Sequence, residues 1–333
     1  MFNSILGIDV AKLTLEVALL VNGKYHHAAF DNSRTGFRSL LKWLNKQSAG
    51  RVHACLEATG TYGEAVSEFL HAAGCTVSVV NPARIKAFAD SQLVRNKTDR
   101  SDARVIADFC LAQHPRFWSP PDPAMRELRA LVRQLDDLMS IRQQERNRLK
   151  SGVSVLSVLH TLRKHIAFLN REIKALEGRI KNHVKLHPKL NRLAALLISI
   201  PGIGHKTACK LIAEIQDIEM FDSPRQLAAY AGVTPKQFVS GSSVHRKARM
   251  SKKGNTVLRT ALFFPAMVAK RCNPVLRPFA IRLADSGKSP MSVTGAVMRK
   301  MLHIVFGVWK SGLPFDPAIE VDPCHAHQSL AFA

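Results

Sequence analysis

The sequence has few acidic residues, no paired cysteine motif and no long apolar run. Asp and Glu number 25 against 48 Lys and Arg, which gives a formal net charge of +23 over 333 residues. The six cysteines show no CxxC spacing, which argues against a disulfide scaffold and for a reduced protein. No stretch approaches the ~20 apolar residues of a membrane helix, and Asp9 and Lys12 interrupt the N-terminal apolar run. We therefore expect a soluble, cytoplasmic protein.

The scarcity of acid is greatest between residues 223 and 284, which contain no Asp or Glu. The cations of this segment are Arg225, Lys236, Arg246, Lys247, Arg249, Lys252, Lys253, Arg259, Lys270, Arg271, Arg277 and Arg282. Short basic runs are usually solvated faces, but an acid-free segment this long favours contact with the phosphates of nucleic acid, so binding should weaken steeply with salt. Our candidate nucleic-acid contacts, here and beside other motifs, are Lys97, Lys206, Lys236, Arg246, Lys247, Arg249, Lys252 and Lys253.

Four carboxylates stand out against this basic background. Asp9 lies near the end of an apolar run, and Glu57 closes another run before a stretch of small, turn-forming residues. Both read as carboxylates at the ends of buried strands. Asp99 and Asp102 stand at the entrance to a helical pattern, where a spacing of three residues puts them on one side of the helix.

These four carboxylates predict a metal site. A cluster of like charges is costly without a cation, and oxygen ligands suit Mg²⁺ or Mn²⁺. Two such ions roughly 4 Å apart can stabilise the attacking and leaving oxygens of phosphoryl transfer. Taken singly, Asp99 could only cap its helix, Asp102 could pair with Arg100 or Arg104, and Glu57 could lie in an exposed turn. The joint pattern favours the metal site.

The chain divides into three predicted regions and a tail. Residues 1–115 alternate strand-like and helix-like runs, which predicts a mixed α/β domain. The strand candidates are residues 3–9, 13–21, 51–57 and 75–81, and the helix candidates are residues 35–47, 62–73, 82–91 and 99–113. The tail, residues 321–333, carries two histidines and a cysteine without a distant partner pair, which favours a flexible segment over a metal site.

Residues 116–187 are predicted to be helical. A seam of apolar residues at spacings of three and four fits a coiled coil, and its members are Leu162, Ile166, Leu169, Ile173, Leu176 and Ile180. A second apolar series consists of Leu128, Val132, Leu135 and Met139. Gly152 could separate two antiparallel helices. Packing within one chain and an intermolecular coiled coil both fit this periodicity.

Residues 188–320 contain two motifs that point to nucleic acid. Two apolar helical patterns meet at the turn Pro201-Gly202-Ile203-Gly204, which looks like a helix-hairpin-helix. Its glycines permit a tight turn and expose backbone N–H groups to phosphate, although a purely structural corner would have the same pattern. The second motif is the loop at residues 238–244, flanked by cations, in which a serine could attack phosphorus. Read locally, this loop could also be a polar turn, with His245 close by.

Six motifs occur in one order along nearly the whole chain. They are GIDVAK at 7–12, EATGTY at 57–62, NKTDRSDAR at 96–104, IPGIG at 200–204, AGVTP at 231–235 and SGSS at 240–243. In this set the chain resembles the DEDD transposases of the insertion-sequence 110 family. The resemblance implies a RuvC-like, ribonuclease-H-like N-terminal domain at 1–115, a helical coiled-coil region at 116–187, and a mainly helical C-terminal transposase domain at 188–320.

The resemblance also implies site residues. Asp9, Glu57, Asp99 and Asp102 match the metal-binding DEDD residues, and these four together with Ser240 are the catalytic candidates. Ser240 matches the proposed nucleophile, with Ser242 and Ser243 as its close competitors. A bridge RNA whose loops pair with donor and target DNA is implied by the resemblance alone. Base pairing would then choose the sequence, while basic protein surfaces hold the backbone.

The mechanistic hypothesis follows from these residues. Mg²⁺, or Mn²⁺, bound by the carboxylates would act at the scissile phosphate while Ser240 attacks, leaving DNA linked to serine and a free hydroxyl end that can reverse the attack. Strand exchange needs more than one active site, so we expect a homodimer or homotetramer in a prokaryotic cytoplasm, at the nucleoid when active. The alternatives are a Holliday-junction resolvase-like nuclease that uses water, and a noncatalytic nucleic-acid-binding protein.

Overall fold

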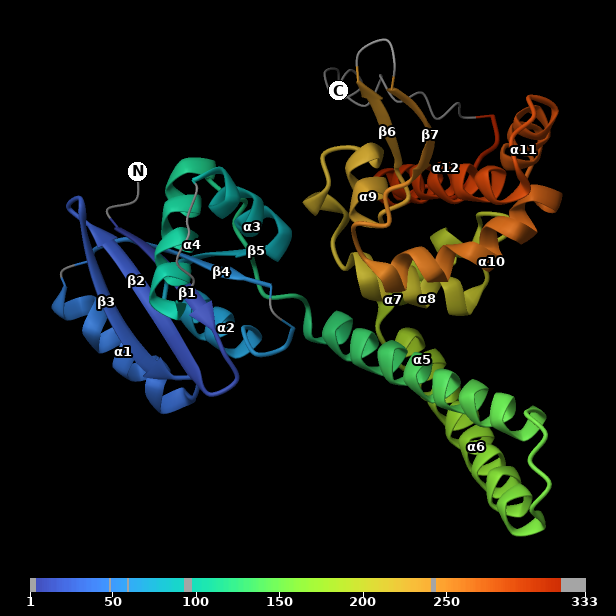
Figure 1. Cartoon of the computed structure of the whole chain (residues 1–333), viewed down its shortest axis with the longest axis horizontal. Helices are drawn as coiled ribbons and strands as arrows, with labels where there is room; N and C mark the ends of the chain where they lie inside the picture. The colour runs from blue at the N-terminus through green and yellow to red at the C-terminus, as the bar shows by residue number, and fades with distance from the viewer. Residues whose placement is uncertain (1–3, 48, 59, 93–97, 241–243, 319–333) are drawn as a thin grey trace. The chain divides into compact units, whose positions relative to one another are not determined.

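The computed structural model describes residues 4–47, 49–58, 60–92, 98–240 and 244–318, with the backbone alone at 237–240 and 244–248. Two compact units, Met1–Pro120 and Pro121–Ala333, make up the chain (Figure 1). No helix in the described part of the chain is long and apolar enough to span a bilayer. Each unit is described by itself below.

The first unit is built on a mixed five-stranded sheet. Its strands lie in the order β3-β2-β1-β4-β5, and their bounds are β1 Ser4–Val10, β2 Thr14–Val21, β3 Lys24–Asp31, β4 Val52–Glu57 and β5 Thr76–Val80. β1, β2 and β3 pair antiparallel, whereas β1, β4 and β5 pair in parallel. The four strands expected from the sequence are confirmed within two residues at each end. The predicted mixed α/β architecture of this region is therefore present.

β3 is a strand that the periodicity did not reveal. Its eight residues have two adjacent histidines and side chains of intermediate exposure, so no buried alternation marks it. The usable signal was Asn22-Gly23, which joins β2 to β3 with both residues at positive φ. An Asn-Gly pair between two strand-forming runs is a strong local sign of a hairpin.

Helices cover both faces of this sheet, as Figure 1 shows. Their bounds are α1 Arg34–Lys46, α2 Glu64–Ala72, α3 Pro82–Ser91 and α4 Asp99–Gln113. Leu40 of α1 and Leu70 of α2 pack in one core with Leu6, while Ile106 of α4 packs in the second core with Ile5. Because Leu6 and Ile5 point to opposite faces of β1, each face buries its own pair of helices.

The second unit begins with a long helical hairpin, α5 Pro123–Lys150 and α6 Leu156–Leu186. The two helices pack side by side within the chain, and Gly152 at φ +87° lies in the turn between them (Figure 1). The buried side chains of α6 include most of the predicted seam, namely Leu162, Leu169, Ile173, Leu176 and Ile180. Intrachain packing thus accounts for this seam.

The remaining elements of the second unit are α7 Pro188–Ile198, α8 His205–Ile215, the 3-10 helix η1 Ile218–Met220, α9 Pro224–Tyr230, the strands β6 Pro235–Ser240 and β7 Val244–Met250, α10 Thr256–Cys272, α11 Leu276–Asp285 and α12 Pro290–Ser311. Their helices share one large apolar core with α5 and α6. β6 and β7 form a separate antiparallel hairpin. The region is mainly helical, as expected, and the predicted tail at 321–333 lies outside the described residues.

Candidate functional site

Asp9 and Glu57 occupy equivalent positions on two neighbouring strands. β1 and β4 pair in parallel with Ile8 opposite Leu56, so Asp9 and Glu57 are the next residue along each strand. Both side chains are half-buried. Because paired residues of parallel strands share one face of the sheet, the apolar runs before them bring two carboxylates to the same edge.

Asp99 and Asp102 lie in the first turn of α4, which starts with a capping box. The Thr98 hydroxyl accepts the Ser101 N–H at 3.1 Å, and the Ser101 hydroxyl oxygen accepts the Thr98 N–H at 2.9 Å. The cap of this helix is therefore Thr98 rather than Asp99. Asp99 is exposed and Asp102 half-buried, and the helix dipole favours negative charge at this end.

Gly7 lets the backbone of α4 lie directly against β1. A Cβ atom at this position would stand 2.1 Å from the carbonyl oxygen of Ala103 and 2.5 Å from the amide nitrogen of Ala107. Real Cβ atoms do not approach backbone so closely, so only glycine fits the existing arrangement. This contact places the start of α4 above the end of β1, where Asp9 lies.

The three aspartates interact electrostatically. Burial raises the pKa of Asp9, and the charges of Asp102 and then Asp99 raise it further, against a lowering hydrogen bond from the Val10 N–H. These oxygen donors fit a hard divalent cation, which would relieve their repulsion. As placed, however, no three His, Cys, Asp or Glu residues of the described chain are gathered closely enough to hold a metal ion. The structure thus brings Asp9, Asp99 and Asp102 into one electrostatic neighbourhood with Glu57 on the adjacent strand, without a finished ligand set.

Ser240 is the last residue of β6, opposite Val244 at the start of β7. Along the hairpin, Lys236 pairs with Arg249, and an irregularity in register follows Lys236. Lys236 and Arg249 are exposed. Among the other predicted residues, Arg246 and Lys247 lie in β7 with only their backbone described, and Lys97, Ser242 and Ser243 lie outside the described residues.

The base of this hairpin is held by backbone contacts. The Ser251 N–H donates to the Thr234 carbonyl at 2.8 Å, and the Lys252 N–H donates to the Gly232 carbonyl at 3.0 Å. The Arg259 guanidinium bridges the carbonyls of Ala231 and Lys252 at 3.2 and 3.1 Å. These contacts fix the base of the β6–β7 hairpin, which carries Ser240. Lys252 and Lys253 follow β7 and are exposed.

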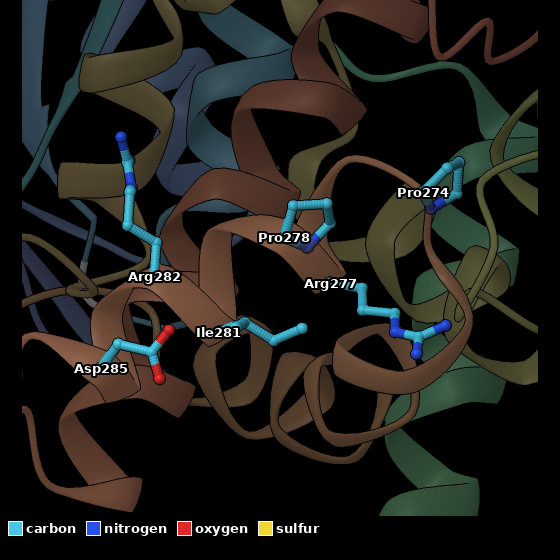
Figure 2. A pocket seen from close by; sticks show the side chains of 6 residues that line it. All are labelled: Pro274, Arg277, Pro278, Ile281, Arg282 and Asp285. Carbon is cyan, nitrogen blue, oxygen red and sulfur yellow. The ribbon is translucent and has the colours of Figure 1, made fainter.

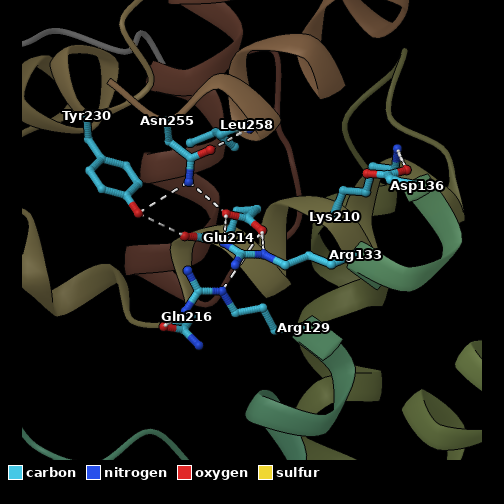
Figure 3. A network of polar contacts seen from close by, with 9 residues as sticks. All are labelled: Arg129, Arg133, Asp136, Lys210, Glu214, Gln216, Tyr230, Asn255 and Leu258. Atoms are coloured by element: carbon cyan, nitrogen blue, oxygen red, sulfur yellow. Dashed lines mark hydrogen bonds and ion pairs between the residues drawn. The ribbon is translucent and has the colours of Figure 1, made fainter. Parts of the chain in front are cut away.

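A buried carboxylate, Glu214, links the segment after the β6–β7 hairpin to helix α5, as Figure 3 shows. Glu214 of α8 has a fully buried side chain and accepts hydrogen bonds from Arg133 of α5 at 2.9 and 3.2 Å. It also accepts one at 2.7 Å from the Asn255 amide, whose backbone N–H donates to the Tyr230 carbonyl at 2.7 Å. Burial opposes ionisation, but these hydrogen bonds and the charges of Arg133 and Arg129 outweigh it and lower the Glu214 pKa.

We did not single out Glu214 or Asn255 from the sequence. The usable signal for Glu214 was an isolated acid within the apolar run Leu211–Ile215 on a helix whose neighbours are buried. Charged residues are almost never fully buried unless they are paired. Such a residue predicts a cationic partner but not its position, because Arg133 lies 81 residues earlier.

Two other basic regions of the second unit each contain a carboxylate close to the cations. Lys206, at the start of α8, donates to Glu177 of α6 at 2.6 Å, so its charge already has a partner. A shallow surface depression of about 610 Å³ lies along α11, and no predicted site residue lines it (Figure 2). Its lining residues are Pro274, Arg277, Pro278, Ile281, Arg282 and Asp285, so a carboxylate accompanies the two arginines there.

Comparison with known proteins finds two family models that match this chain. A family model described as Transposase, for IS110-type DEDD enzymes, matches residues 6–158, and a second, described as Transposase IS116/IS110/IS902 family, matches residues 194–280. The first range includes the four carboxylates, and the second includes the Ser240 hairpin. The matches also cover the turn between α7 and α8.

Full-length relatives extend the likeness to nearly the whole chain. The Pilin gene-inverting protein of Moraxella bovis is 33% identical over 322 residues, covering 96% of this chain and 99% of that protein. Its counterpart in Moraxella lacunata is 32% identical over the same shares. The Transposase for insertion sequence element IS1111A of Coxiella burnetii is 27% identical over 232 residues, or 60% of each chain.

Two family matches in the expected order and a relative that covers almost the whole chain agree with the motifs and with the fold. Such proteins are recombinases that act on DNA. The chain belongs to the IS110 family of transposases.

Proposed function

We propose that this protein recombines insertion-sequence DNA by metal-dependent cleavage and rejoining through a phosphoserine intermediate. The observation that carries the proposal is the electrostatic repulsion of Asp9 by Asp102 and Asp99. The close approach of α4 to Gly7 of β1 brings these carboxylates near one another. In a chain of formal charge +23, a group of carboxylates at one edge of the sheet suits metal-assisted chemistry on a polyanion.

Asp9, Glu57, Asp99 and Asp102 would hold the divalent cation, Mg²⁺ or Mn²⁺. When bound, this cation supplies positive charge to the phosphate oxygens and to the leaving oxygen. The residues of the chain orient it: β1 and β4 fix two carboxylates at one sheet edge, and the capped start of α4 supplies the other two. The first unit would accordingly serve as the RuvC-like nuclease domain.

Ser240 would be the nucleophile. Its Oγ loses a proton and forms a bond to phosphorus, while the bond from phosphorus to one strand oxygen breaks and that oxygen takes up a proton. The phosphodiester is thereby exchanged rather than hydrolysed, so the reverse attack by a strand hydroxyl restores a DNA backbone without an external energy source. The position of Ser240 at the end of β6, next to a basic strand, supports this role.

The remaining assignments concern how nucleic acid is held. The turn between α7 and α8, with Gly202 at φ +106°, would act as a helix-hairpin-helix on the backbone. Lys236, Arg249, Lys252 and Lys253 would contact phosphate from the hairpin side. A bridge RNA would select donor and target DNA by pairing, and the helical hairpin α5–α6 would join subunits of a dimer or tetramer.

Inversion is a second candidate outcome because two relatives that cover nearly the whole chain carry the name Pilin gene-inverting protein. Inversion and transposition can share the same cleavage and rejoining chemistry and differ in how the DNA sites are arranged. A plasmid that carries the element with its flanks distinguishes the two outcomes by whether the segment leaves its site or changes orientation within it.

The chemical proposal is tested by trapping DNA on the protein. Full-length protein, flanking RNA, Mg²⁺ and matched DNAs are resolved on a denaturing gel, and the adduct is mapped by peptide analysis. We expect an adduct at Ser240 that Ser240→Ala abolishes and that Asp99→Asn suppresses without loss of DNA binding. Metal-dependent cutting with no adduct would instead identify a nuclease that uses water, and unchanged recombination in Asp99→Asn would exclude the carboxylate site.

A further inference from the structure

A group of cations on α9 and α12 lies outside the sites described above. Arg299, Lys300 and His303 fall on one side of α12, at helical spacings of three and four residues, and all three are half-buried. α9 packs against α12 and carries the exposed Arg225. The three cations Arg225, Arg299 and Lys300, together with the imidazole of His303, are called the α9–α12 cation group below.

The other three residues act electrostatically on His303. Burial, followed by the charges of Arg299, Lys300 and Arg225, lowers the pKa of His303 to about 4. Within the described chain, Arg299 Nε and His303 Nε2 are covered from solvent and have no hydrogen-bond partner. A covered donor without an acceptor is unfavourable, so the Arg299 N–H suits an acceptor such as a phosphate oxygen supplied from outside.

The surrounding sequence offers little negative charge to neutralise the group. Neither α9 nor α12 contains Asp or Glu, Asp222 lies three residues before Arg225, and Asp285 is the single acidic residue between positions 223 and 315. By contrast Lys310, at the far end of α12, pairs with Glu219 at 2.6 Å. One helix thus carries a cation paired with a carboxylate and a group that repels itself.

The cation group lies near the base of the β6–β7 hairpin, which carries Ser240. Gly295 of α12 lies against the end of β7, where a Cβ atom would stand 2.8 Å from Met250 Cε. Arg299 and His303 follow Gly295 at successive intervals of four residues, so one face of α12 runs from the hairpin base to the cation group. The cation group therefore lies one to two helical turns from the contact between α12 and the base of the β6–β7 hairpin.

We propose that Arg225, Arg299, Lys300 and His303 form a binding site for the backbone phosphate of a nucleic-acid strand engaged by the β6–β7 hairpin. Guanidinium and ammonium groups recognise phosphate oxygens through charge-assisted hydrogen bonds, and arginine can do so with two parallel bonds. The inference rests on the proposed function, since it assumes that the hairpin acts on nucleic acid. DNA and RNA share this phosphodiester chemistry.

Lys300→Gln and Lys310→Gln provide a matched test. Both remove one lysine charge from α12, but only Lys300 belongs to the cation group, whereas Lys310 has a carboxylate partner. Binding of the full-length protein to a labelled DNA duplex and to RNA of equal length is measured over a range of salt. For the polymer that occupies the site, Lys300→Gln should lower the slope of log K against log salt by about 0.9, and Lys310→Gln should leave it unchanged.

Arg299→Lys tests the geometry separately, because it keeps the charge and loses the guanidinium fork. We expect weaker binding at every salt concentration with an unchanged slope, and thermal melts should show that all variants are folded. Equal slopes for Lys300→Gln and Lys310→Gln, in a protein whose wild type binds tightly, would overturn the site alone. A wild type that binds neither polymer would overturn the proposed function and the site with it.

Discussion

Substituting Glu214 with glutamine should destabilise the second unit by about 3 kcal/mol. The side chain of Glu214 is fully buried and accepts three hydrogen bonds, two from Arg133 and one from Asn255. Glutamine keeps the volume but replaces one accepting oxygen by a donor and removes the charge that compensates Arg133. Breaking such a buried pair costs about 3–5 kcal/mol. The lower end applies here because the Arg133 side chain is 46% exposed and regains water.

Denaturant unfolding of the full chain, followed by a probe in the second unit, measures this effect. A melting temperature lower by roughly 6–12 °C accompanies the loss for a unit of this size. The double variant Arg133→Met with Glu214→Gln serves as the control, because it removes the uncompensated cation together with the carboxylate. We expect the stability lost in the double variant to be smaller than the sum of the losses in the two single variants by about 1–3 kcal/mol.

The direction of the Glu214 pKa shift determines how its contribution to stability changes with pH. The folded-state pKa of Glu214 is lowered below its ordinary value of 4.5. Its contribution is therefore fully present above about pH 4.5 and is lost as pH falls through the folded-state pKa. The stability difference between wild type and Glu214→Gln should shrink in that acidic range. A difference under about 1 kcal/mol at neutral pH, or one that stays constant into acid, would refute the reasoning.

Other outcomes follow from the same structure. Gly7→Ala should destabilise the first unit by about 1–3 kcal/mol and reduce DNA cleavage, whereas Gly178→Ala, with open space at its Cβ, should be neutral or stabilising in the same unfolding and cleavage assays. Thr98→Ala should cost about 1 kcal/mol in urea unfolding through loss of the α4 cap, and Thr98→Ser should restore most of it. Because the folded-state pKa of His303 is lowered from 6.5 to about 4, stability should rise with pH across that window, and a pH series of melts on His303→Gln should show a smaller rise. Chelation with EDTA should abolish strand cleavage while gel shifts show retained DNA binding, and added Mg²⁺ should restore cleavage.

The sequence allowed most of the first unit to be predicted because its strands are apolar and its helices have clear starts. The Thr98-to-Ser101 box and the apolar runs before Asp9 and Glu57 are local signals, and local signals survive folding. β3 escaped because its side chains are only half-buried, so no alternation marks it. Which residues share a site depends instead on contacts between distant segments.

Glu214 and Arg133 illustrate that limit. Each is an ordinary residue in its own helix, and only the packing of α5 against α8 makes them a buried pair. Lys206 shows the reverse case: its position in the α8 start favours a phosphate contact, yet the fold gives it Glu177 as a partner. The grouping of Arg299 and His303 with Arg225 likewise becomes visible only when α9 lies on α12.

The contact between β1 and α4 has a consequence for which substitutions this chain can accept. At Gly7 the backbones of β1 and α4 meet with no side chain between them. No slightly larger or smaller side chain can therefore adjust the distance between the two elements at this point. The spacing between Asp9 and the aspartates of α4 is thereby protected from the gradual drift that side-chain packing permits. Substitutions on the exposed surface of the chain leave this spacing unchanged, so a search for variants with altered chemistry should begin at Gly7 and the residues of α4 that face it.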